Sequence, residues 1–196
     1  MSESIRHPLY APIKRAIDLA VSGIGLLTLA PPLAVIMIAI RMASPGPALH
    51  RQPRVGRDEQ TFTCYKLRTM YTGVPQVPTH MSQKSAVTPI GAVLRRLKID
   101  ELPQLYNVLK GDMSLVGPRP SLTTQHELIE MRRGRNVFSI RPGVTGLAQV
   151  LGVDMSDPQR LARLDQRYLW RRSTMLDMRL LAATFSRQSR RTGRSA

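Results

Sequence analysis

The sequence predicts a mostly helical α+β protein in which a membrane helix precedes a small cytoplasmic domain. Three observations predict this fold class. Residues 16–40 are almost entirely apolar, residues 61–69 alternate in the manner of a strand, and three later segments carry apolar residues at helical spacing. A chain of 196 residues is long enough for one domain with a buried core.

The apolar segment 16–40 contains a single ionisable residue, Asp18. Its length is sufficient to cross a hydrocarbon core of about 30 Å, so we expect it in a membrane. Lys14 and Arg15 precede it and Arg41 follows it. Because both flanks are basic, the positive-inside rule favours neither orientation of a simple span.

Pro31 and Pro32 interrupt this segment near its middle. Neither proline donates a backbone hydrogen bond and both crowd the preceding turn, so a kink is expected after Ala30. A helix that enters the bilayer, bends and returns would leave both flanks cytoplasmic, with Ser22 or Thr28 bonding the carbonyls freed by the bend. An ordinary spanning helix is an equal alternative. A cleaved signal peptide is a weaker one, because no small-residue cleavage site follows.

The chain carries 29 Lys and Arg residues against 13 Asp and Glu residues, for a formal net charge of +16. This balance favours an anionic partner: nucleic acid, anionic lipid or a phosphorylated substrate. Few aromatic residues stand among the cations to stack bases, and the apolar segment has no use in a nucleic-acid-binding protein, so we expect no nucleic-acid partner. The single cysteine, Cys64, excludes an internal disulfide and is expected to be a small buried apolar residue.

Asp100 and Glu101 are adjacent in a segment rich in basic residues. A carboxylate nucleophile beside cations that hold phosphate is the composition that phosphoryl transfer requires. The pair opens a predicted helix that ends at Gly111, so Asp100 also fits the simpler role of an N-cap. Adjacent residues point about 100° apart on a helix, so the two carboxylates are expected to have different roles. The surrounding cations are Arg95, Arg96, Lys98 and Arg119.

Two segments hold an arginine next to proline. Arg119 lies between two prolines in 116–120, and Arg141 begins a second Pro- and Gly-containing segment at 141–146. Proline limits backbone freedom and presets the direction of a guanidinium, whereas glycine permits close backbone approach. Either arginine alone is better explained as a solvated surface charge. Two of them alongside an acidic pair favour phosphate binding.

Two further helices are expected. One begins at Thr88, an N-cap followed by Pro89 in the first turn. The other begins after Asp157 and carries arginines opposite an apolar face, with Trp170 at the boundary. Such a basic amphipathic helix suits the headgroup layer of an anionic membrane, and it suits packing within the domain nearly as well.

The remaining segments lack periodicity. Residues 71–87 are expected to form a mobile loop that covers a site. Residues 187–196 contain no apolar run and are expected to form a disordered basic tail that attracts lipid. We therefore expect a membrane segment at 1–43, a membrane-associated catalytic domain at 44–186 and the tail.

Five motifs between residues 44 and 150 are specific enough to indicate a family. Four of them are Ser-Pro-Gly-Pro at 44–47, Tyr-Lys-Leu-Arg-Thr-Met at 65–70, Asp-Glu-Leu-Pro-Gln-Leu at 100–105 and Arg-Pro-Gly-Val-Thr-Gly-Leu-Ala-Gln-Val at 141–150. The fifth is Asn-Val-Leu-Lys-Gly-Asp-Met-Ser-Leu-Val-Gly-Pro-Arg-Pro at 107–120. With these motifs the chain resembles the bacterial sugar transferases, the small monotopic polyprenyl-phosphate phosphoglycosyl transferases.

The resemblance implies a monotopic protein of the bacterial inner membrane, with a re-entrant helix whose ends are both cytoplasmic. It implies that a nucleoside diphosphate sugar donates its sugar 1-phosphate to polyprenyl phosphate and so begins assembly of a glycan, with Mg²⁺ as cofactor. Asp100 would attack the sugar-linked phosphate and form a covalent intermediate at the metal. Glu101 would help to bind the metal or would manage a proton. A homodimer is compatible with these expectations.

The resemblance also marks substrate-binding candidates and two departures. Ala30 stands where a serine is common, so the bend must rely on proline and its neighbours. Val153 stands where an arginine is common, which suggests an altered donor preference. A membrane-bound scaffold that has lost activity is the alternative, although the intact acidic pair argues against it. The candidates for holding phosphate are Arg95, Arg119 and Arg141, together with Lys66 and Arg68.

Overall fold

The computed structural model describes residues 9–73 and 86–193, with side chains described as far as residue 186. The loop expected at 71–87 therefore lies mostly outside the described residues. Its two ends lie together: Met70 forms a β-bridge with Val87, and the Tyr71 N–H donates to the Ala86 carbonyl at 3.0 Å.

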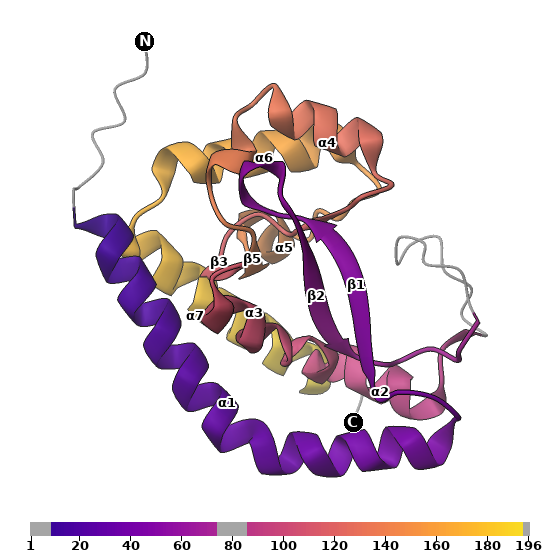
Figure 1. The fold of residues 1–196 in the computed structure, drawn as a ribbon. Helices are drawn as coiled ribbons and strands as arrows, with labels where there is room; N and C mark the ends of the chain where they lie inside the picture. The colour runs from indigo at the N-terminus through magenta and orange to yellow at the C-terminus, as the bar shows by residue number, and fades with distance from the viewer. Residues whose placement is uncertain (1–8, 74–85, 194–196) are drawn as a thin grey trace.

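The first element, α1 (Tyr10–Ala43), is a continuous helix that bends part-way along its length (Figure 1). By length and composition it could cross a membrane, which confirms the expected apolar helix. Pro31 and Pro32 lie inside it. They account for the bend, because the carbonyls of Leu27 and Thr28 lose their helical N–H partners to the prolines.

The side-chain hydroxyls near the bend do not bond the freed carbonyls, so that expectation is wrong. The Thr28 hydroxyl donates to the carbonyls of Ile24 at 2.9 Å and Gly25 at 3.2 Å, one turn earlier than the freed groups. A threonine side chain reaches only three or four residues back along its own helix. The Ser22 hydroxyl is buried and has no hydrogen-bond partner among the described residues.

Most of α1 is left uncovered by the rest of the chain. Only 11% of its most apolar window is buried, and the side chains of Leu27 and Met42 are 79% and 83% exposed. Its main contact is with α3 (Gln104–Lys110), where a Cβ atom at Gly25 would lie 3.1 Å from the Leu105 side chain. The core helix of a globular protein would bury such an apolar surface, so this one is available to lipid.

Two small sheets form the centre of the domain. β1 (Leu49–Val55) and β2 (Thr61–Leu67) pair antiparallel around η1 (Arg57–Glu59), and β4 (Ser121–Leu122) pairs with the other edge of β1. β3 (Ser114–Val116) and β5 (Gly143–Thr145) form a parallel pair. β2 confirms the expected strand. Cys64 on β2 is 1% exposed and lies in the main apolar cluster, as expected.

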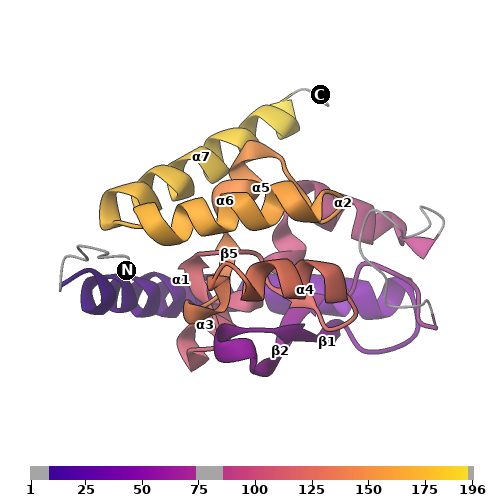
Figure 2. The same cartoon turned by 90° about the horizontal axis from the view of Figure 1, so that it is seen from above.

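Helices enclose these sheets. Their bounds are α2 (Pro89–Leu97), η4 (Ile99–Glu101), α4 (His126–Arg133), η5 (Val137–Ser139), α5 (Leu147–Leu151), α6 (Pro158–Arg171) and α7 (Thr174–Gly193). Figure 2 shows α6 and α7 forming a layer on the opposite side of the molecule from the β1–β2 hairpin. The apolar residues of α6 are buried, and the helix packs on α4 and α5, whereas Trp170 is 67% exposed. The sequence left two positions open for this helix, the headgroup layer of a membrane or packing within the domain. In the structure its apolar face packs within the domain.

One expected helix start is confirmed and another is wrong. The Thr88 hydroxyl accepts a hydrogen bond from the Gly91 N–H at 3.0 Å, with Pro89 as the first residue of α2. Asp100 is not an N-cap, because it lies inside the 3₁₀ turn η4 and α3 begins only after Pro103. Pro103 has no N–H to bond back along an α-helix, so a tighter turn precedes α3.

At the other end of the chain, the backbone of 187–193 continues α7, where the sequence suggested a disordered tail. A helix that is already nucleated on a packed segment gains one hydrogen bond for each residue added, even without apolar side chains. Residues 194–196 lie outside the described part of the chain.

Asp177 joins α1 to the last two helices. Its carboxylate is buried and accepts hydrogen bonds from Lys14 at 2.8 Å, from Tyr10 at 3.0 Å and from Tyr168 at 2.7 Å. These donors come from α1 and α6, so one acidic residue near the start of α7 fixes the N-terminal end of α1 against the domain.

Candidate active site

The two proline-framed arginine segments lie side by side, because β3 leads into 116–120 and pairs with β5 inside 141–146. A Cβ atom at Gly117 would lie 2.6 Å from the Arg141 carbonyl oxygen, and one at Gly143 would lie 2.1 Å from the Gly117 nitrogen. Only glycine permits this approach, as the sequence predicted. The contact fixes where the loop that carries Arg119 leaves β3.

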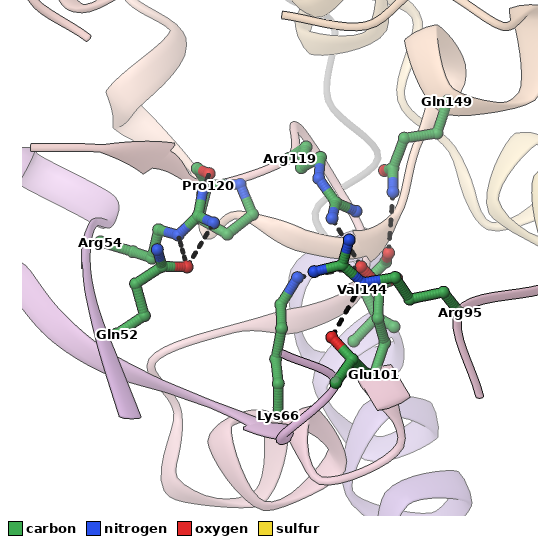
Figure 3. A network of polar contacts seen from close by, with 10 residues as sticks. Gln52, Arg54, Lys66, Arg95, Glu101, Arg119, Pro120, Val144 and Gln149 are labelled. Carbon is green, nitrogen blue, oxygen red and sulfur yellow. Dashed lines mark hydrogen bonds and ion pairs between the residues drawn. The ribbon is translucent and has the colours of Figure 1, made fainter. Parts of the chain in front are cut away.

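Glu101 is the centre of a cluster of charged side chains (Figure 3). Its Oε1 atom accepts hydrogen bonds from Lys66 Nζ at 3.1 Å and from Arg119 Nη2 at 2.5 Å. The three residues come from η4, β2 and the loop after β3. Burial acts to raise the pKa of Glu101, but Arg119 and Lys66 outweigh burial and hold this pKa well below its usual range. Glu101 therefore stays ionised and orients both cations.

Asp100 has a different environment from its neighbour. The structure records no hydrogen bond or ion pair to its carboxylate within residues 9–73 and 86–193, since Lys66 and Arg119 bond Glu101 instead. Burial and then the charge of Glu101 raise the pKa of Asp100 to about 6, against the opposing effect of the nearby cations. Near neutral pH this carboxylate is mostly ionised and is not held in a salt bridge. Both properties are needed in a nucleophile.

Two buried arginines hold the loop that carries Arg119. Arg54 Nη1 donates to the Pro120 carbonyl at 2.9 Å, and Arg132 Nη1 donates to the Arg119 carbonyl at 2.8 Å. Arg132 is also paired with Asp165 at 2.6 Å, and both side chains are almost fully buried. The sequence did not reveal these residues, because no local pattern marks a buried arginine whose partners lie far along the chain.

Arg95 and His50 complete the cluster. Arg95 Nε donates to Thr69 Oγ1 at 2.8 Å, and Figure 3 shows its guanidinium directed toward Lys66 and Glu101. His50 lies opposite Lys66 in the β1–β2 register. Burial and then the charge of Lys66 lower the pKa of His50, which keeps this imidazole neutral near pH 7. The cluster therefore combines three predicted cations with one paired and one unpaired carboxylate, a balance that attracts phosphate.

Arg68 is placed elsewhere, although the sequence suggested a contact with substrate. Its Nη1 atom donates to the Pro45 carbonyl at 2.5 Å, and its Nη2 atom donates to the Ser44 carbonyl at 2.7 Å. The side chain is buried and holds the C-terminal end of α1 against the end of β2. Arg68 therefore has a structural position, because the turn after α1 leaves carbonyls that need a donor.

Arg141 is also separate from the cluster around Glu101. Its Nε atom donates to the Gly111 carbonyl at 2.7 Å, and its side chain lines a cavity beside the first half of α1. Val153, the departure from the expected arginine, is 8% exposed in an apolar cluster with Leu128 and Leu161. An apolar residue matches that environment, in which an arginine would be desolvated.

Asp100 is the residue that fits a magnesium ion. Across the described ranges, no three His, Cys, Asp or Glu side chains lie together as metal ligands. Glu101 already accepts two hydrogen bonds from cations, so Asp100 offers the unpaired carboxylate. Mg²⁺ is commonly bound by one or two carboxylates, with substrate phosphates and water as its other ligands. The donor set therefore fits an ion that is shared with a phosphorylated substrate.

Comparisons with known proteins point to the same family as the motifs. Residues 9–191 match the family described as Bacterial sugar transferase. Over 190 residues the chain is 40% identical to "Undecaprenyl-phosphate glucose phosphotransferase" of Komagataeibacter xylinus, covering 89% of this chain and 35% of the relative. It is 36% identical to "UDP-N-acetylgalactosamine-undecaprenyl-phosphate N-acetylgalactosaminephosphotransferase" of Aeromonas hydrophila, covering 90% of this chain and 44% of that protein.

A third relative matches over nearly its whole length. "Exopolysaccharide production protein PSS" of Rhizobium leguminosarum bv. phaseoli is 38% identical over 191 residues, which is 88% of this chain and 92% of the relative. In contrast, the chain spans less than half the length of the first two relatives.

Proposed function

Because the chain belongs to the bacterial sugar transferase family, we propose that it transfers a sugar 1-phosphate from a nucleoside diphosphate sugar to a polyprenyl phosphate. Two similar proteins carry names that specify undecaprenyl phosphate, which supports this acceptor. The observation that carries the proposal is the unpaired Asp100 carboxylate, with its pKa raised to about 6, inside a cluster of cations. The product is a lipid-linked sugar that begins a glycan.

In the first step, an Asp100 carboxylate oxygen attacks the phosphorus that bears the sugar. A P–O bond forms to Asp100 and the P–O bond to the nucleoside phosphate breaks, so the nucleoside monophosphate leaves with the electron pair. Lys66, Arg95 and Arg119 hold the phosphate oxygens and balance the charge that develops on them. Glu101 keeps Lys66 and Arg119 in position through its two hydrogen bonds.

In the second step, an oxygen of the polyprenyl phosphate attacks the same phosphorus. A diphosphate bond forms, the acyl-phosphate bond breaks, and Asp100 is released as a carboxylate. In the first step, Mg²⁺ held by Asp100 would neutralise charge on the donor diphosphate. Division into two steps means that the two anionic substrates need not occupy the cluster at the same time, which lowers the electrostatic cost of each step.

The proposed membrane arrangement brings both substrates to this cluster. The bend in α1 and the basic residues on both sides of it, Lys14 and Arg41, support a re-entrant helix in the inner membrane with both ends cytoplasmic. α7 supports a surface contact, because Met175, Met178 and Phe185 lie on one face and are 63%, 38% and 74% exposed. A lipid-borne acceptor then approaches from the bilayer and a soluble donor from the cytoplasm.

The experiment that tests the function measures transfer of radiolabelled sugar phosphate to undecaprenyl phosphate. The full chain in detergent is supplied with Mg²⁺ and a panel of donors that includes UDP-glucose and UDP-N-acetylgalactosamine. We expect Asp100→Asn to abolish turnover while the protein still inserts into membranes. Asp58→Asn, a matched change at an exposed aspartate, should leave turnover intact. Transfer by the Asp100→Asn protein would remove this residue as nucleophile, and no transfer from any donor would favour an inactive scaffold.

A further inference from the structure

A second basic site lies outside the cluster around Glu101. A cavity of about 390 Å³ opens between the first half of α1, β3, the segment before β5 and the end of α6. None of the residues of the Glu101 cluster lines it. The charged residues that do are Lys14, Arg15, Asp18, Arg57, Arg141 and Arg172.

The cavity has an excess of positive charge, although Lys14 and Arg57 are paired with Asp177 and Asp58, which lie outside its lining. Asp18 is the only acidic residue among its lining residues, and its carboxylate accepts a hydrogen bond from the Leu115 N–H at 3.0 Å. Burial and then the charges of Arg15 and Arg57 lower the pKa of Arg141. The three guanidinium groups are therefore close enough to repel one another, and an anion between them would relieve this repulsion.

Backbone contacts hold two of these guanidinium groups in place. Arg15 donates from Nη1 to the Val108 carbonyl at 2.7 Å and from Nη2 to the Leu109 carbonyl at 3.0 Å. Arg141 donates from Nε to the Gly111 carbonyl at 2.7 Å. Carbonyl oxygens fix the orientation of a guanidinium but do not neutralise its charge. Arg15 and Arg141 are thus preorganised around the cavity, whereas Arg57 is half exposed and pairs with Asp58 at 3.1 Å.

A separate observation places an unused hydroxyl in the cavity wall. Ser114 is 2% exposed, and its Oγ atom has no hydrogen-bond partner among the residues that the structure describes. Ser114 lines the cavity beside Arg141. A buried hydroxyl without a partner is energetically unfavourable, so Ser114 Oγ is available to donate a hydrogen bond to a group in the cavity.

We propose that this cavity is a second anion site, which binds a phosphate group between Arg15, Arg57 and Arg141 with Ser114 as an additional donor. Guanidinium forks and a hydroxyl match the oxygens of a phosphate monoester or diester. The phosphate belongs either to a phospholipid headgroup at the membrane surface or to a soluble phosphate compound. Its binding links α1 to η1 and to the segment before β5. The proposal does not depend on the transfer reaction.

The test measures the shift in thermal unfolding midpoint of the full chain in neutral detergent. One arm adds inorganic phosphate and the other adds phosphatidylglycerol to the micelles, each against sodium chloride at equal ionic strength. Variants Arg57→Gln and Ser114→Ala remove single donors from the cavity. Arg51→Gln, an exposed arginine of β1 outside the lining, is the matched control. Lys66→Gln weakens phosphate binding at the Glu101 cluster and so distinguishes that binding from binding in the cavity.

We expect Arg57→Gln and Ser114→Ala to raise the ligand concentration needed for half of the midpoint shift, by about tenfold for the arginine variant. Arg51→Gln and Lys66→Gln should leave this concentration unchanged. A shift with inorganic phosphate identifies a soluble compound, and a shift with phosphatidylglycerol alone identifies a lipid headgroup. Equal shifts in the cavity variants and the Arg51→Gln control, or no shift in either arm, would overturn the proposal.

Discussion

At the scale of single residues, two adjacent carboxylates acquire opposite properties from their surroundings. Glu101 is ion-paired, and its pKa lies well below the usual range because of Arg119 and Lys66. Asp100 is unpaired, and burial and the charge of Glu101 raise its pKa to about 6. The sequence predicted that the two would have different roles. It did not show which residue is paired, because Lys66 lies 35 residues earlier and Arg119 lies 18 residues later.

The raised pKa of Asp100 predicts the pH dependence of the first step. A protonated carboxyl is a poor nucleophile, so the rate of nucleoside monophosphate release at donor concentrations below saturation, which reports the free protein, should rise tenfold per pH unit below about pH 6 and level off above it. Single-turnover measurements between pH 4.5 and 8 would show this limb. A rate that stays constant down to pH 4.5 would contradict the assignment.

The same pKa predicts an effect on stability. The folded-state pKa of about 6 lies above the ordinary aspartate pKa of 3.8, so the contribution of Asp100 to stability is present below pH 3.8 and is lost as the pH rises through about 6. Asp100→Asn should therefore stabilise the fold at pH 7 by about 1–3 kcal/mol, and this gain should vanish at pH 4. Denaturant unfolding at both pH values measures the difference. A variant that is less stable than the parent at pH 7 would refute the burial argument.

At the scale of elements, buried arginines replace the apolar contacts that usually fix a loop. Arg132 on α4 bonds the Arg119 carbonyl and pairs with Asp165 on α6, so the position of the loop that carries Arg119 depends on two helices outside the site. Helix periodicity predicted α2 and α6, and alternation predicted β2. Short strands such as β3 and β5 were not predicted, because three residues carry no periodic signal and their pairing depends on glycine contacts across the chain.

The Arg132–Asp165 pair can be tested by single and double substitution. Arg132→Met leaves a buried carboxylate without its partner and should destabilise the fold by about 3–5 kcal/mol. Adding Asp165→Leu removes the unpaired charge and should restore much of the stability, but not the hold on the Arg119 carbonyl. Unfolding and transfer rate are measured together, with the exposed Arg133→Gln as the control. Full activity in the stable double variant would show that Arg132 does not position Arg119.

At the scale of the whole molecule, the cluster around Glu101 is built on a domain fixed to one bent apolar helix. The sequence predicted this helix and the bend at its two prolines. The contacts that fix the helix to the domain could not be predicted from the sequence. Asp177 and Arg68 bind opposite ends of α1 through partners more than 20 residues away, and neither belongs to a local pattern. The proposed membrane attachment and the proposed chemistry thus belong to one packed unit.

The proposed topology predicts how exposed positions on both sides of α1 react with a membrane-impermeant thiol reagent. Leu9→Cys and Arg51→Cys should both be labelled only from the cytoplasmic side, because a re-entrant helix returns both ends to that face. Cys64 is buried and should not react in the folded parent protein. Changing Pro31 and Pro32 to alanine favours a straight helix and should move one position to the other side. Labelling of the parent positions from opposite sides would mean a true span.

In the proposed reaction, Asp100 carries the sugar phosphate between donor and acceptor. The most direct measurement is the intact mass of the full chain incubated with donor and Mg²⁺ but without polyprenyl phosphate, followed by peptide mapping under conditions that preserve acyl phosphates. We predict a mass increase of one sugar phosphate at Asp100, which disappears when acceptor is added and is absent in Asp100→Asn. Product formation with no adduct, or an adduct that maps to Glu101, would contradict the account.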